Sequence, residues 1–200
     1  MRIRLGLTRA LRDDEAGVRT EAARALERIG GVASLEKLAA TARSPDAGGA
    51  LRALYALAEI GGAGALAILT EALKAPQAEV RAAAVKLLAE TRDPKVLDSF
   101  IEAFDDPSPD VKVLLVEALG EFRDPRLSEI LLQELQRSSG PVREAVITAL
   151  GRLGDLQAVH TLLPLLADDT PAVRRRVAEV LGRLGVRAAE GELKGISSPP

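Results

Sequence analysis

Few side chains in this sequence could do chemistry, and they do not gather in one segment. His160 is the only histidine, and there is no cysteine. A serine nucleophile needs a histidine base close by, while a cysteine nucleophile or a thiolate metal site needs cysteine. Acidic pairs such as Asp105/Asp106 and Asp168/Asp169 could act as general acid and base, but they recur at one position of a repeating pattern, which favours capping and ion pairing. We therefore predict a surface role for His160, and no catalytic residue, cofactor or metal.

Two short motifs could bind phosphate or nucleic acid, and both lack what that binding requires. The stretch GGAGA (61–65) is rich in glycine but lacks the preceding strand and the GK[ST] ending of a phosphate cradle. The run RRR (174–176) is too short for a nucleic-acid footprint in a chain of net charge −2. No stretch approaches the roughly 20 apolar residues of a membrane helix. We expect no nucleic-acid partner, no membrane insertion and a cytoplasmic location.

The sequence repeats itself every 31 residues. A column of valines opens the repeats, with Gly49 in the one register that lacks valine, and a column of leucines follows eight positions later. The valines are Val18, Val80, Val111, Val142 and Val173, and the leucines are Leu26, Leu57, Leu88, Leu119, Leu150 and Leu181. A fixed period of this length, unbroken by insertions, predicts a solenoid of helix pairs.

Each repeat is expected to hold two helices, named A and B in chain order. In helix B of the fifth repeat the apolar residues share one stripe at helical spacing, formed by Val142, Val146, Ala149, Leu150 and Leu153. Helix A carries two apolar columns, which are Leu7, Leu38, Leu69, Phe100, Leu131, Leu162 and Leu11, Ala42, Leu73, Phe104, Leu135, Leu166. The pattern predicts six helix pairs from about residue 2 to 186, a degenerate seventh A helix over 187–196 and a disordered tail over 197–200. Residues 1–196 are expected to form a single domain.

Glycines and prolines predict where the helices end. Prolines at 45, 76 and 107 mark the turn from A to B, and RDP at 92–94 and 123–125 is expected to stop two B helices. Pro164 lies inside the last A helix and is expected to kink it. Gly48 and Gly49 are expected to weaken helix B of the second repeat. Four glycines are expected to cap the remaining B helices, since glycine tolerates left-handed backbone: Gly30, Gly61, Gly154 and Gly185.

The stretches EVRAAAVKLLAETRDPKVLDSFIEAFDD (79–106) and PVREAVITALGRLGDLQAVHTLLPLLADD (141–169) show the repeat most clearly. They resemble HEAT repeats of the short bacterial and archaeal kind, also called phycobilisome-lyase-type, and the resemblance covers nearly the whole chain. It implies an all-α, right-handed α-solenoid, an α–α superhelix of six helix pairs with a degenerate C-terminal cap. Such repeats occur in scaffolds, adaptors, bilin lyase subunits and one metal hydroxylase, and fold alone does not fix function. The hydroxylase needs His-Glu dipeptides on successive repeats, whereas His160 is followed by Thr161.

The resemblance also implies a structural ladder of ion pairs. In HEAT repeats the basic residue after the valine column commonly pairs with acidic residues of the A–B turns. Acidic pairs at 13/14, 105/106 and 168/169 are available partners for three of these residues, and Ala50 interrupts the ladder in the second repeat. The predicted basic members are Arg19, Arg81, Lys112, Arg143 and Arg174.

Two functions fit this resemblance. The first is a non-enzymatic, monomeric scaffold or adaptor that binds a protein or peptide on a concave face lined by the B helices. The alternative is a bilin lyase-type subunit or a chromophore-binding protein, in which the same fold holds an open-chain tetrapyrrole. A bilin site is expected to offer aromatic side chains and a His, Asp or Cys near the pyrrole nitrogens, and this face has one tyrosine. The scaffold is therefore the favoured function.

The partner is expected on the face of the B helices opposite the buried stripe. One register of that face runs Thr20, Leu51, Ala82, Val113, Glu144, Arg175, and the next runs Arg24, Tyr55, Lys86, Glu117, Thr148, Glu179. A third register shrinks to Ala58, Ala89, Gly120, Gly151 and Gly182, which predicts a shallow floor.

Charge on this face predicts the chemistry of the partner. Lys86 and Glu90 can pair at four-residue spacing, whereas Glu117 and Glu121 are like charges with no local compensation. A basic or amphipathic segment of the partner would relieve that repulsion. The predicted partner-binding residues are Leu51, Tyr55, Glu59, Lys86, Glu90, Val113, Glu117 and Glu121.

Overall fold

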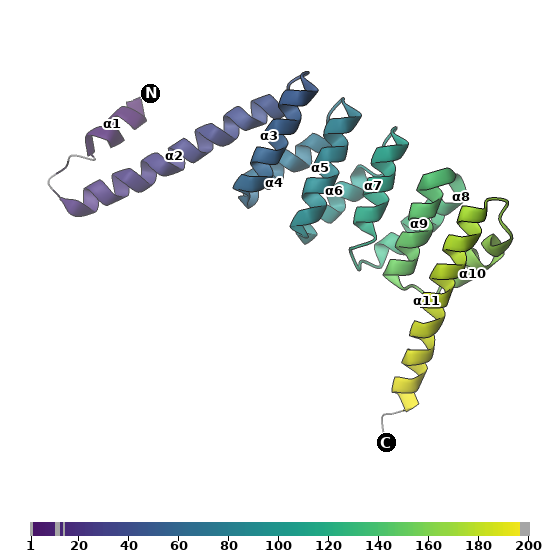
Figure 1. The fold of residues 1–200 in the computed structure, drawn as a ribbon. Helices are drawn as coiled ribbons and strands as arrows, with labels where there is room; N and C mark the ends of the chain where they lie inside the picture. The colour runs from purple at the N-terminus through teal and green to yellow at the C-terminus, as the bar shows by residue number, and fades with distance from the viewer. Residues whose placement is uncertain (1, 11–12, 14, 197–200) are drawn as a thin grey trace. The chain divides into compact units, whose positions relative to one another are not determined.

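The computed structural model describes residues 2–10, 13 and 15–196 and divides the chain into two compact units, Met1–Val80 and Arg81–Pro200. All regular structure among the described residues is helical, as the periodicity predicts (Figure 1). The boundary between the units falls within helix α5 (Ala78–Thr91). A single domain over 1–196 stays a prediction, and the tail over 197–200 lies outside the described residues.

Unit 1 contains the first A–B pairs. Its elements are α1 (Arg2–Ala10), α2 (Ala16–Ala42), α3 (Ala47–Ile60), α4 (Gly62–Glu71) and the 3-10 helix η1 (Ala72–Lys74). Helix α2 packs against α1, α3 and α4, and α3 packs against α4. The buried side chains of α3 and α4 include Leu57 and Leu69 of the predicted columns, together with Leu54, which lies outside them.

Unit 2 contains the later pairs, and in each pair the B helix follows the A helix. After α5 come η2 (Pro94–Val96), α6 (Leu97–Glu102), α7 (Pro109–Leu119), α8 (Arg126–Arg137), α9 (Gly140–Leu153), α10 (Ala158–Leu162), η3 (Leu163–Ala167) and α11 (Pro171–Ile196). Helix α9 packs against both α7 and α11, so the B helices form a row (Figure 1). The A helices α8 and α10 contact each other behind that row.

The leucine column of the B helices is the centre of the core. Leu57, Leu88, Leu119 and Leu150 are all 0% exposed. Leu181, in the last repeat, is only half-buried, and the side chain of Leu26 lies outside the described residues. The leucine register deduced from the 31-residue period is therefore confirmed in the four repeats from Leu57 to Leu150.

Helix ends match the prediction in part. Gly61 and Gly154 end α3 and α9 with positive φ values of 66° and 75°, which confirms two of the four glycine caps. The caps predicted at Gly30 and Gly185 are wrong, because α2 and α11 run straight through them. Helix B of the first repeat and helix A of the second repeat are therefore one continuous helix, labelled α2 in Figure 1.

The residue that follows Gly154 supports the turn there, whereas Gly61 ends α3 with no such side chain after it. Asp155 comes after Gly154, and its carboxylate accepts hydrogen bonds from the Gln157 N–H at 2.9 Å and from the Ser128 hydroxyl. Val32 follows Gly30 and Gly31, and Val186 follows Gly185, so neither sequence offers a side chain that would satisfy the freed backbone donors. A glycine inside a helix costs only about 1 kcal/mol relative to alanine, which a continuous helix tolerates.

Pro164 changes the type of its helix, whereas Gly48 and Gly49 fit the start of theirs. At Pro164 the α-helix gives way to the 3-10 helix η3, and Leu166 of the predicted buried column is exposed. Gly48 and Gly49 lie in the first turn of α3, where Asp46 accepts a 2.9 Å hydrogen bond from the Gly49 N–H. A Cβ atom on Gly49 would lie 2.6 Å from Oδ2 of Asp46, so glycine suits this cap. The predicted weakness, which assumed glycines in the helix interior, therefore loses its physical reason.

Truncation of a column leucine tests the register. Leu119→Ala removes a side chain that is fully buried in unit 2, and we expect a loss of about 2–5 kcal/mol in the free energy of unfolding. His160 is exposed, so His160→Ala is expected to change that free energy by no more than about 0.5 kcal/mol. Urea melts of both variants decide the matter, and equal losses would mean that the register is wrong.

Candidate functional site

The most deeply buried ion pair among the described residues of unit 2 joins Arg81 and Asp106. Nε of Arg81 lies 2.7 Å from Oδ2 of Asp106, and Nη2 lies 2.9 Å from Oδ1. The two side chains are 11% and 4% exposed, so the pair is almost fully removed from water. The Ser108 N–H also donates to Oδ1, at 2.8 Å, which ties the turn before α7 to the start of the previous B helix.

The acidic partner stands 25 positions after its basic residue, at the A–B turn of the following repeat. Arg143 follows the same rule and pairs with Asp168 at 3.3 Å. Position 137, the corresponding position for Lys112, holds an arginine. Lys112 instead pairs with the buried Glu134 at 3.1 Å and with Asp105 at 3.6 Å. The pairing of Lys112 with the turn at 105/106 is therefore confirmed through Asp105, and the turns at 105/106 and 168/169 also supply partners to Arg81 and Arg143 of the preceding repeats.

The two remaining ladder residues are Arg174 and Arg19, and only Arg174 has a described side chain. Nη1 of Arg174 donates to the backbone carbonyl oxygens of Asp168 at 2.7 Å and Asp169 at 3.1 Å, so it caps the end of η3 through the backbone. The side chain of Arg19 lies outside the described residues. These pairs stabilise turns between helices and hold no group in a position to react with a substrate.

The eight predicted partner-binding residues fall into two groups. Leu51, Tyr55 and Glu59 are on α3 in unit 1, and Tyr55 is 55% exposed. The other five are in unit 2, on α5, on α7 or just after α7: Lys86, Glu90, Val113, Glu117 and Glu121. All the charged members are exposed, whereas Leu51 and Val113 are half-buried. That the eight residues form one surface stays a prediction.

A groove of about 380 Å³ lies along α7, α9 and α11 in unit 2. It contains two of the predicted residues, Val113 and Glu117. We call it the B-helix groove, and its lining is Val113, Glu117, Pro141, Glu144, Ala145, Thr148, Ala149, Arg152 and Arg176. Alanine and valine side chains form apolar walls, and the four charged side chains are two carboxylates and two guanidinium groups.

The charges of the B-helix groove are unequally neutralised. Arg152 pairs with Glu121 at 2.7 Å, and Arg176 pairs with Glu179 at 2.9 Å. Glu117 and Glu144 have no ion pair with any residue that the structure describes. The unsatisfied charge of the groove is therefore negative.

The pairing of Glu121 corrects the predicted repulsion. Helix α7 ends at Leu119, so Glu117 and Glu121 are not stacked on one helix, and Arg152 supplies the compensation that the sequence did not reveal. The possible pair between Lys86 and Glu90 is also missing from the described part of the chain, although both side chains are exposed. Glu117 has no such compensation, because no described cation of unit 2 forms an ion pair with it.

The glycines of the predicted floor serve helix packing. A Cβ atom on Gly120 would lie 3.1 Å from Cα of Ala149, and one on Gly151 would lie 2.8 Å from Cγ1 of Val180. Glycine therefore allows α7 to approach α9, and α9 to approach α11. Both glycines also line a second hollow of about 230 Å³, which shares Arg152 with the B-helix groove.

Four residues that line the B-helix groove are not among the eight predicted partner-binding residues: Glu144, Thr148, Arg152 and Arg176. Glu144 and Thr148 stand one repeat beyond Val113 and Glu117 in the same registers, so extending those registers would have found them. Arg152 and Arg176 have no such signal, because their place in the groove depends on how close α9 and α11 approach. Thr148 also donates a 2.9 Å hydrogen bond to the carbonyl oxygen of Glu144.

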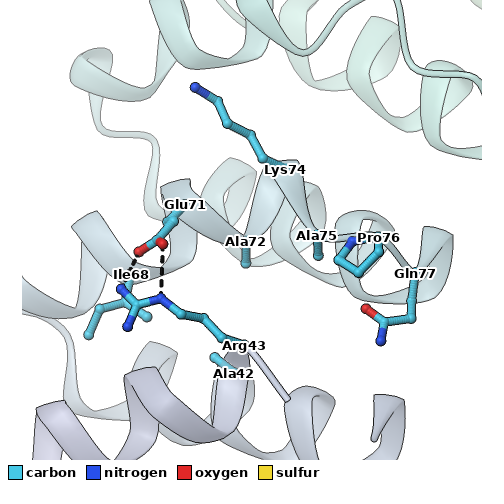
Figure 2. A pocket seen from close by; sticks show the side chains of 9 residues that line it. All are labelled: Ala42, Arg43, Ile68, Glu71, Ala72, Lys74, Ala75, Pro76 and Gln77. Carbon is cyan, nitrogen blue, oxygen red and sulfur yellow. Dashed lines mark hydrogen bonds and ion pairs between the residues drawn. The ribbon is translucent and has the colours of Figure 1, made fainter. Parts of the chain in front are cut away.

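Unit 1 contains a separate cavity of about 280 Å³ between the end of α2, α4 and η1, shown in Figure 2. Arg43 and Glu71 close one side of it with hydrogen bonds of 2.9 and 2.6 Å, the dashed lines of Figure 2. The hydrogen bond from Arg43 keeps the pKa of Glu71 below its ordinary value. Alanine, isoleucine and proline side chains form the rest of the wall. This arrangement offers no nucleophile or acid–base pair.

Metal and membrane sites are also missing from the described residues. None of them gather into groups of three or more His, Cys, Asp or Glu side chains suited to a metal ion. No helix within the same residues combines the length and the apolar composition needed to cross a bilayer.

The sequence pattern of the family described as HEAT repeats matches residues 35–120 and 128–194. The chain belongs to the HEAT-repeat family. This result agrees with the paired helices, the 31-residue register and the ion pairs between repeats. No curated protein sequence matches this HEAT-repeat chain.

Two solved structures resemble the HEAT-repeat chain in fold. The first is the complex of CpcE and CpcF of phycocyanin lyase from Nostoc sp. PCC7120, with a TM-score of 0.63 and 22% sequence identity over 80% of this chain and 68% of that chain. The second is an engineered protein, with a TM-score of 0.51 and 18% identity over 93% and 97% of the two chains. The first similarity is consistent with a HEAT repeat of the phycobilisome-lyase type.

The Arg81–Asp106 pair predicts how stability depends on pH. Burial disfavours the charge of Asp106, but hydrogen bonds from Arg81 and Ser108 and the charges of Arg81 and Lys112 outweigh it, so the pKa of Asp106 lies below its ordinary value. The stability that Asp106 provides is then complete above its ordinary pKa of about 3.9 and is lost as the pH falls through the folded-state pKa. Asp106→Asn is expected to cost about 3–5 kcal/mol at neutral pH, because it leaves Arg81 buried beside a neutral amide.

Urea melts across the acid range check this prediction. The difference between wild type and Asp106→Asn should be constant down to about pH 5 and should shrink below about pH 4. Glu71→Gln removes a carboxylate from the exposed pair with Arg43, and as a control it is expected to melt like the wild type. A difference that grows on acidification would contradict the assignment.

Proposed function

We propose that this HEAT-repeat chain is a non-enzymatic scaffold. It binds a protein segment on the face of its B helices that lies opposite the buried stripe. The observation that carries the proposal is the B-helix groove, in which two carboxylates have no partner among the described residues. HEAT repeats are a protein-interaction fold, and helical solenoids commonly present extended surfaces of this kind. The groove volume is at the small end for a binding pocket and suits a few side chains of a longer segment.

The charge of the groove supports a basic segment as the partner. Arg152 and Arg176 are already neutralised by Glu121 and Glu179, so a partner meets the free carboxylates of Glu117 and Glu144. Lysine or arginine side chains of the partner would pair with these two carboxylates, while an apolar side chain contacts Val113, Ala145 and Ala149. Complementary charge of this kind raises specificity and the rate of association.

Tyr55 on α3 supports a second contact surface, within unit 1. A tyrosine that is 55% exposed offers a large, stiff contact area, and tyrosine is enriched in protein interfaces. Half-buried Leu51 lies one helical turn before Tyr55 on α3 and adds to the same apolar area.

The similarity to phycocyanin lyase supports the second candidate, a bilin-binding subunit. The lining of the B-helix groove consists of aliphatic, threonine, carboxylate and guanidinium side chains, which suit a peptide better than a conjugated tetrapyrrole. Purified protein mixed with free bilin separates the two candidates, since a shift in the bilin absorbance band is expected only if the chromophore binds.

A peptide selection tests the scaffold proposal. A random peptide library selected on the intact protein is expected to yield segments enriched in lysine and arginine. The Kd of the best peptide should then rise about tenfold for Glu117→Lys and for Glu144→Lys, since each replaces an attractive charge pair by repulsion. Tyr55→Ala tests the separate surface on α3 and should weaken the binding of a partner that contacts this helix.

Glu129→Lys is the matched control, because Glu129 is an exposed residue of α8, an A helix of the same unit. It makes the same change of charge and should leave the Kd unchanged. Selected peptides without an excess of basic residues, or an equal loss of affinity in Glu129→Lys, would rule out the B-helix groove as the binding site.

A further inference from the structure

The second hollow of unit 2, of about 230 Å³, is lined mainly by arginine. It lies where the B helices α7 and α9 end, and Arg183 of α11 completes its wall. We call it the arginine hollow, and its lining is Gly120, Glu121, Arg123, Gly151, Arg152 and Arg183. The two glycines carry no side chain, so a ligand in this hollow would meet mainly guanidinium groups.

The cations of the arginine hollow are only partly neutralised. Arg123 has no ion pair with any residue that the structure describes. Arg183 pairs with Glu179 at 3.3 Å, but Glu179 lies closer to Arg176 of the B-helix groove, at 2.9 Å, so one carboxylate serves two guanidinium groups. Among the described residues, only Arg152 of this hollow has a carboxylate to itself. The excess charge is therefore positive here, whereas it is negative in the B-helix groove.

The two sites adjoin each other, because Arg152 lines both. Glu144, a free carboxylate of the groove, lies on α9 eight positions before Arg152, which is about 12 Å along the helix axis. On the neighbouring helix the order is the same, since Glu117 precedes Arg123. An extended peptide rises about 3.4 Å per residue, so about four of its residues would connect the negative site with the positive one.

We propose that the arginine hollow binds an acidic side chain of the same partner segment whose basic side chains enter the B-helix groove. This inference rests on the proposed function and adds the orientation of the segment, which lies along the B helices. Its lysines or arginines meet Glu117 and Glu144, and its aspartate or glutamate stands about four residues away. Guanidinium groups can donate two hydrogen bonds to one carboxylate, which fixes the position of an acidic side chain better than a point charge does. The partner segment is then bipolar and not basic throughout.

Arginines near the end of a helix can also have a structural role, because the last carbonyl groups attract cations. Arg152 joins two repeats through Glu121, so its substitution would affect packing as well as the hollow. Arg123 is exposed, lies beyond the end of α7 at Leu119 and makes no such pair, so Arg123→Gln removes a charge with little expected effect on stability. Lys95→Gln is the matched control, since it removes one exposed positive charge from η2, outside both sites.

A random peptide library selected on the intact wild type, Arg123→Gln and Lys95→Gln tests the inference. The wild type and Lys95→Gln are expected to yield peptides with an acidic residue about four positions from a lysine or arginine. On Arg123→Gln the excess of acidic residues should fall, while the excess of lysine and arginine remains. For a peptide selected on the wild type, Arg123→Gln should raise the Kd about threefold, and replacing the acidic residue of the peptide by its amide should abolish that difference.

The other outcomes separate this inference from the proposed function. Peptides rich in lysine and arginine but without the spaced acidic residue would overturn the inference and leave the proposed function intact. Peptides without an excess of basic residues would overturn both. An excess of acidic residues that persists on Arg123→Gln would place the acidic contact outside the arginine hollow and overturn the inference. Urea melts of the three proteins are expected to coincide, and a loss confined to Arg123→Gln with an unchanged selection would assign Arg123 to the end of α7 instead.

Discussion

The structure depends on one constraint, namely that a helix pair of this sequence cannot bury its own apolar stripe. Leu88, Leu119 and Leu150 occur once in each repeat and are completely removed from water in the folded protein. In unit 2, the B helix α9 is covered on both sides by its neighbours α7 and α11. Gly120 and Gly151 permit this close approach, because a methyl group at either position would collide with the next helix. Stability therefore comes from contacts between neighbouring repeats, as in other solenoids.

Charged residues have two distinct roles around this core. The buried pair of Arg81 and Asp106 joins consecutive repeats at their turns, where a carboxylate can also accept backbone hydrogen bonds. The carboxylates of exposed Glu117 and half-buried Glu144 belong to no such pair within the described residues, so removing them is expected to cost the fold little. Stability and recognition are thus assigned to different side chains of the same helices, and substitutions can separate them.

The sequence predicts the helical class and the register well, because a 31-residue period repeats the same information many times. Local breaks are harder to predict. LGRLG ends a helix at Gly154 and continues one at Gly185, so the five residues alone do not decide where a helix ends. The partner of Arg81 was not predicted for a similar reason, since its pairing with Asp106 depends on how neighbouring repeats pack. The registers of Val113 and Glu117 predicted part of the lining of the B-helix groove. Arg152 could not be predicted in this way, because its place in the groove depends on how closely α9 packs against α7.

Hydrogen exchange of the intact protein tests the dependence on neighbouring repeats most directly. Helix α9 is packed between the B helices α7 and α11, whereas α10 and η3 lie in the last repeat, and η3 carries the exposed Leu163 and Leu166. The account predicts the slowest exchange of unit 2 in α9, and clearly faster exchange in α10 and η3. Exchange in α10 and η3 as slow as in α9 would contradict it, because protection would then not require a neighbour on both sides.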